Sequence, residues 1–95
     1  MALAPDLQTI VESYKFSNTE RQDLIKYLSE ELKQLELDSK GEEVDYDLAI
    51  ELYVALPNHV KDFVEETAGY MIAWHYGTLD LVEALKDIIN KLERS

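Results

Sequence analysis

The chain has 95 residues, of which 46% are hydrophobic, and its 20 acidic and 9 basic residues give a formal net charge of −11. This apolar content suffices for a folded core, so the acidity belongs to a folded surface rather than to a disordered segment. A negative field repels nucleic acid and anionic membranes, and we expect no direct binding to either. The absence of cysteine excludes disulfide frameworks, thiolate metal sites and cysteine nucleophiles.

The beginning of the chain and its apolar stretches bear on its location. The first residues, Met1 to Asp6, lack the basic and apolar regions of a signal peptide. No apolar stretch approaches the roughly 18 residues that a membrane-spanning helix needs. We therefore expect a cytoplasmic protein.

Apolar residues recur three and four positions apart almost throughout, which is typical of an all-helical protein. A short first helix is expected after Pro5, a favourable first-turn residue. Ser17 and Glu20 form the sequence pattern of a capping box, so a second helix begins there. The apolar face of this second helix consists of Leu24, Leu28, Leu32 and Leu35.

The segment from Leu37 to Val44 is predicted to be a loop, with its turn at Gly41. A third helix is expected from about Asp45 to Leu56, with its acidic residues at the N-terminal end that the helix dipole favours. Because the part from Leu48 to Leu56 is apolar nearly all round, we expect it to be the most buried element.

Two more helices complete the chain. Pro57 ends the third helix, and Asn58 is suited to cap the fourth through its side-chain oxygen. The fourth helix is expected to end at Gly77, and Thr78 to cap the fifth. The predicted core faces are Val60, Phe63, Val64, Thr67, Ala68, Met71, Ile72 and His75, and then Leu81, Val82, Leu85, Ile88, Ile89 and Leu92. The sequence thus predicts an all-α fold over residues 1–95, a single acidic helical domain built as a compact bundle of four main helices plus a short N-terminal helix.

Motifs for catalysis and for cofactors are not found. The three glycines are isolated, so there is no phosphate-binding loop, and neither His59 nor His75 lies in a nucleophile motif. Di-iron bundles need a glutamate three residues before a ligating histidine, but Leu56 and Ile72 occupy those positions. We therefore expect no catalytic residues, no cofactor and no dedicated metal ligands, and we do not expect an enzyme.

The loop around Gly41 was tested as a calcium site, because Val44-Asp45-Tyr46-Asp47 resembles the second half of an EF-hand loop. When Gly41 takes the sixth position that this loop requires, Lys40 falls on the fifth, a ligand position, and Asp47 on the twelfth, where glutamate is needed. A positive lysine at a ligand position argues against specific calcium binding. Weak divalent-cation binding through the 36–47 loop is kept as an alternative.

Two features suggest partner binding. The stretch from Glu36 to Glu51 holds seven acidic residues and one base, Lys40. Farther on, Tyr70, Trp74 and Tyr76 form a predicted aromatic ridge on the fourth helix, and tryptophan and tyrosine are enriched at interfaces. The alternative is that these rings fill the protein's own core.

The sequence therefore predicts a small non-catalytic protein-interaction or regulatory module with a basic protein partner. The predicted partner-binding residues are Glu42, Glu43, Asp45, Asp47, Tyr70, Trp74 and Tyr76. Two alternatives stay open: a nucleic-acid-mimicking inhibitor of a basic protein, and the weak cation binder. A homodimer through the apolar third helix and the aromatic ridge is a third possibility.

Overall fold

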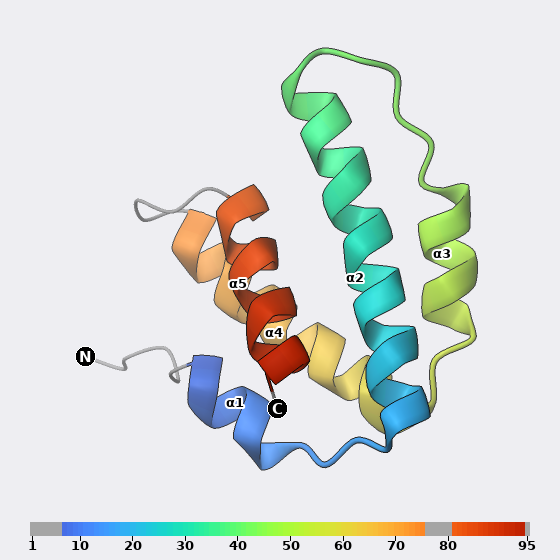
Figure 1. Cartoon of the computed structure of the whole chain (residues 1–95). Coiled ribbons are helices and arrows are strands. Elements are labelled where there is room, and N and C mark those ends of the chain that lie inside the picture. The colour runs from blue at the N-terminus through green and yellow to red at the C-terminus, as the bar shows by residue number, and fades with distance from the viewer. Residues whose placement is uncertain (1–6, 76–80, 95) are drawn as a thin grey trace.

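The computed structural model describes residues 7–75 and 81–94, with the side chains at 7, 8, 10, 68–75, 81 and 84 outside the description. These residues form five α-helices and contain no strand, which confirms the predicted all-α bundle (Figure 1). The helices are α1 (Leu7–Ser13), α2 (Asn18–Ser39), α3 (Asp47–Val54), α4 (Asn58–His75) and α5 (Leu81–Arg94).

The core lies where α5 packs against both α2 and α4, and α1 closes it by lying against α4 and α5. The apolar faces predicted for α2, α4 and α5 supply its side chains, because residues three and four apart project from one side of a helix. The largest fully buried residues are Leu24, Leu28, Val60, Phe63, Thr67, Ile88 and Leu92.

The start of α2 follows the predicted capping box. The Ser17 side-chain oxygen accepts a hydrogen bond from the Glu20 N–H at 3.2 Å, and the Glu20 carboxylate accepts one from the Ser17 N–H at 2.9 Å. At α4 the prediction is displaced by one residue. The Pro57 carbonyl accepts the N–H groups of Val60 and Lys61, each at 3.0 Å, so Asn58 is the first helical residue rather than the cap.

An aromatic cluster fastens the α1–α2 connection to α4. The Tyr14 and Phe16 rings both meet the Phe63 ring edge-on, with centroids 5.2 and 5.4 Å away. The Tyr14 hydroxyl also donates to the Glu66 carboxylate at 2.6 Å. That hydrogen bond, together with partial burial, raises the pKa of Tyr14 to about 12. The cluster therefore joins two segments that are far apart in the sequence.

The expectation that the third helix is the most buried element is wrong. Helix α3 is shorter than predicted, and Ala49 is its one buried residue. The side chains of Leu48, Ile50 and Val54 are 47%, 57% and 64% exposed. The reason is that α3 packs mainly on α2 and lies at the edge of the molecule, so one side of the helix is covered and the other faces outward (Figure 1).

Candidate functional site

The position of α3 is set by a buried glutamine on α2. Gln34 is only 5% exposed, and its side-chain oxygen accepts the Asp45 N–H at 2.8 Å while its amide donates to Glu30 at 3.1 Å. The Asp45 carboxylate in turn accepts the Asp47 N–H at 3.0 Å, which supports the first turn of α3. The loop reaches this point through Gly41, whose φ of 74° favours glycine.

The four acidic residues predicted to bind a partner are all exposed on this loop and on the first turn of α3. They are Glu42, Glu43, Asp45 and Asp47. Within the described part of the chain, none of the four forms an ion pair with a lysine or arginine, because the observed pairs lie elsewhere. Their carboxylates are therefore exposed to solvent and not held in an ion pair with a lysine or arginine.

Tyr53 of α3 contacts both α2 and α4. The Tyr53 ring packs against Tyr27 with centroids 5.6 Å apart, and its hydroxyl donates to the Glu65 carboxylate on α4 at 3.4 Å. The Lys61 ammonium lies 5.7 Å from the centroid of the same ring. Partial burial and then Glu65 raise the pKa of Tyr53, so its hydroxyl remains a neutral hydrogen-bond donor at physiological pH.

Tyr46, Ile50, Tyr53 and Val54 follow one another at helical spacing along one side of α3. Ile50 and Val54 are exposed, whereas the two tyrosines are half-buried. Burial and the nearby carboxylate of Asp38 raise the pKa of Tyr46, so this hydroxyl is neutral as well. Together these four side chains form an apolar and aromatic strip that carries two neutral tyrosine hydroxyl groups.

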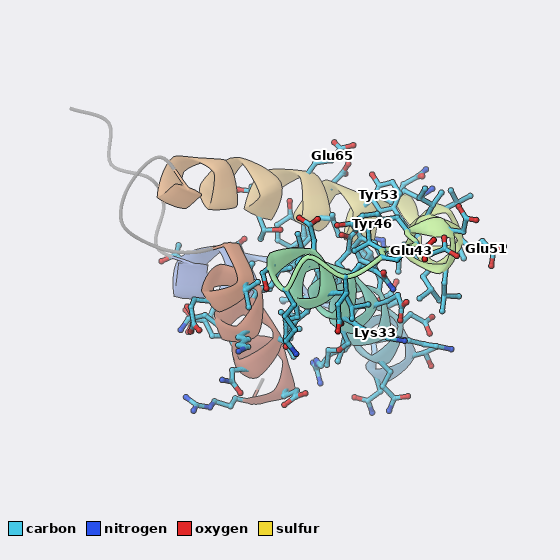
Figure 2. All side chains as sticks on the ribbon, turned by 90° about the horizontal axis from the view of Figure 1, so that it is seen from above. Lys33, Glu43, Tyr46, Glu51, Tyr53 and Glu65 are labelled. Atoms are coloured by element: carbon cyan, nitrogen blue, oxygen red, sulfur yellow. The ribbon has the colours of Figure 1, made fainter. Side chains whose placement is uncertain are left out.

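The strip and the acids form one surface, because Asp47 and Glu51 lie four residues apart on the adjoining line of α3. In Figure 2, Tyr46, Tyr53 and Glu65 are labelled in the upper part of the view, and Glu43 and Glu51 follow toward its right edge. Lys33 is labelled below all of them. We define the α3 surface as the strip with its neighbouring acids. Its members are Glu42, Glu43, Asp45, Tyr46, Asp47, Ile50, Glu51, Tyr53 and Val54.

The predicted aromatic ridge cannot be joined to this surface. Tyr70 and Trp74 belong to α4, but their side chains lie outside the described residues, as does the whole of Tyr76. The role assigned to these rings, and the core position expected for the His75 side chain, stay predictions. The predicted partner-binding residues do not include Tyr46, Ile50, Tyr53 and Val54. The signal for the last three is the apolar third helix, which the sequence suggests as a homodimer face.

Weak cation binding through the 36–47 loop stays a prediction. Among the side chains that the structure describes, no three histidine or carboxylate groups converge as a metal-binding set. The Asp45 carboxylate is engaged by the Asp47 N–H instead. Within the described residues, no helix is both long enough and apolar enough to span a membrane.

The chain was compared with known protein families, curated proteins and solved structures. No family model, no curated protein and no solved structure matches this chain. Its function is therefore argued from the chemistry of its own surfaces.

Proposed function

We propose that this protein is a non-catalytic interaction module that binds a basic protein partner through the α3 surface. The observation that supports this most strongly is the 57% and 64% exposure of Ile50 and Val54 beside acids that form no ion pair with a lysine or arginine. Contiguous apolar surface with a polar rim is typical of interaction sites. Here the aliphatic and aromatic strip would supply the desolvated centre of the interface, and the carboxylates its rim.

The charge of the α3 surface favours a cationic partner over a second copy of the chain. In a two-fold dimer the same patch lies on both subunits, so the acidic residues of one copy would face those of the other. A partner that presents apolar side chains among lysines and arginines would meet opposite charge instead. Such complementarity accelerates association and excludes wrong partners.

We assign the protein no catalytic role, because carboxylates, neutral tyrosines and aliphatic groups on an open surface bind rather than react. The module would regulate its partner by covering the partner's basic surface. A chain without cysteine suits a reducing compartment, and we place the interaction in the cytoplasm.

The proposal is tested by affinity capture with matched variants, at moderate salt and from cells of the protein's own source. An amide variant carries Glu42→Gln, Glu43→Gln, Asp45→Asn and Asp47→Asn. An apolar-site variant carries Ile50→Ser and Val54→Ser. A control variant carries Glu83→Gln and Glu93→Gln, which removes two exposed acids from α5.

We expect one basic protein to be retained by the wild type and the control, and to be lost from the other two variants. Once that protein is purified, the amide variant should associate with it at least about tenfold more slowly than the wild type does. The apolar-site variant should dissociate from it faster than the wild type. Equal retention by all four proteins would contradict the proposal. A nucleic-acid mimic predicts instead that added DNA displaces the wild type and that the apolar-site variant binds normally.

A further inference from the structure

An arginine occupies a core-facing position at the start of α2. Arg21 precedes Leu24 by three residues and Leu28 by seven, which places all three on one line of the helix. Leu24 and Leu28 are 0% and 2% exposed, whereas Arg21 is half-buried. Its Nε atom is buried and has no hydrogen-bond partner. A charged side chain thus replaces the apolar residue that this position would otherwise favour.

The other half-buried bases of the chain have partners. The Lys91 ammonium lies 3.1 Å from the Asp87 carboxylate, and that of Lys61 lies over the Tyr53 ring. Burying the Nε–H of a guanidinium group without an acceptor is unfavourable, because that N–H loses its hydrogen bond to water and gains none in the protein. In a chain with 20 acidic residues, acceptors are plentiful. The Nε–H of Arg21 is nevertheless left without an acceptor, so an acceptor from outside the chain could pair with it.

A cavity of about 290 Å³ adjoins Arg21. It is lined by residues of α1, of the connection to α2 and of the start of α2, none of which belongs to the α3 surface. Its lining residues are Val11, Glu12, Tyr14, Lys15, Phe16 and Arg21. Lys15 is exposed, so the cavity has one cation at its solvent side and a half-buried one on α2.

The remaining walls are suited to a flat apolar group. The Tyr14 and Phe16 rings are stacked with centroids 5.9 Å apart and an interplanar angle of 20°. Val11 adds a buried aliphatic side chain that is 4% exposed. The Tyr14 hydroxyl is already engaged by Glu66, so the ring contributes its apolar part. Cations and aromatic faces in one cavity favour a ligand with an anionic end and an apolar body.

We propose that this cavity binds a small aromatic monocarboxylate. The carboxylate pairs with the Arg21 guanidinium, whose planar geometry matches two carboxylate oxygens, and Lys15 adds a second positive charge. The ring of the ligand packs along Tyr14, Phe16 and Val11. A single negative charge is favoured over two, because the Glu12 carboxylate borders the same cavity and the chain carries a net charge of −11.

Benzoate is the probe for this proposal, with acetate, phenyl phosphate and benzyl alcohol as comparisons. We expect benzoate to bind with a Kd of about 1 mM, an affinity in keeping with its small size. Amide resonances of residues 11–21 should shift on titration. At ten times the Kd, Tm should rise by about 6–11 °C. Acetate and benzyl alcohol should bind at least tenfold more weakly, because each lacks one half of the recognised group.

Arg21→Met separates this site from an ordinary structural role. We expect the variant to have a higher Tm than the wild type, because it removes a buried N–H that has no acceptor, and to bind benzoate at least tenfold more weakly. Lys26→Met, at an exposed position on the same helix, should leave both quantities unchanged.

Four results would each overturn the proposal. Absence of benzoate-induced shifts in the wild type would show that the cavity does not bind the probe. An equal response to acetate would show that the rings do not contribute, and tighter binding of phenyl phosphate would contradict the preference for one charge. A lower Tm for Arg21→Met would show that the guanidinium already has a stabilising partner within the protein.

Discussion

Helices α3 and α5 are both rich in aliphatic residues, yet they differ in how much of this surface the protein covers. In α5 the aliphatic residues recur on one side, and Leu85, Ile88 and Leu92 are at most 3% exposed. In α3 they surround the helix, and only Ala49 is buried. The difference shows that burial depends on how many neighbours a helix has. Helix α5 packs on two long helices, whereas α3 packs mainly on one.

The largest effect on stability is expected in the core that α5 helps to form, at Phe63 of α4. Its side chain is 0% exposed and meets the rings of Tyr14 and Phe16. Phe63→Ala should lower the free energy of unfolding by about 3–5 kcal/mol, because it leaves a cavity and frees the α1–α2 connection. Urea denaturation measures this loss. A cost below about 1 kcal/mol would show that the site collapses around the smaller side chain.

Two valines allow a sharper test, because one substitution of nearly unchanged shape can be made on each side. Val60 in α4 is 0% exposed and Val54 in α3 is 64% exposed. Val60→Thr should cost about 1–3 kcal/mol, since it buries a hydroxyl group, whereas Val54→Thr should change stability by less than about 0.5 kcal/mol. Equal costs in thermal or urea unfolding would mean that Val54 is covered in solution, for example by a second copy.

A smaller effect is expected where α3 is attached to α2, at Gln34. Gln34→Ala removes the acceptor of the Asp45 N–H and the donor to Glu30. We expect a loss of about 1 kcal/mol in the free energy of unfolding, with faster amide hydrogen exchange over residues 42–48. Gln22→Ala, at an exposed position on the same helix, is the control and should alter neither quantity. Unchanged exchange in Gln34→Ala would show that the loop is held by other contacts.

The smallest effect concerns pH and the start of α2. The Ser17 N–H, and then His59, whose Nε2 lies 2.8 Å from the carboxylate, hold the pKa of Glu20 below its ordinary value of 4.5, against partial burial. A lowered folded-state pKa adds stability above pH 4.5 that is lost as pH falls through the folded value. The stability advantage of wild type over Glu20→Gln, measured in urea, should therefore be present at neutral pH and decline on acidification. With Glu93→Gln as the reference for loss of one charge, a pH-independent difference would contradict this assignment.

The local signals in the sequence predicted much of the fold. The capping box at Ser17 and Glu20 located the start of α2, and apolar spacing identified the buried side chains of α2, α4 and α5 among those that the structure describes. These signals succeed because hydrogen bonds and side-chain periodicity within one helix depend on residues only a few positions apart. For the candidate site, the sequence located the exposed acids of the loop but not the apolar strip beside them.

What the sequence by itself determined is the helical class, the core faces of the long helices and the acidic character of the surface. The tertiary structure decided which apolar residues remain outside: it attached α3 to α2 through Gln34 and left Ile50 and Val54 exposed. It also placed Arg21 beside Tyr14 and Phe16 at one cavity. The physical reason is that periodicity reveals which face of a helix is apolar, whereas only packing between helices decides whether another element covers that face.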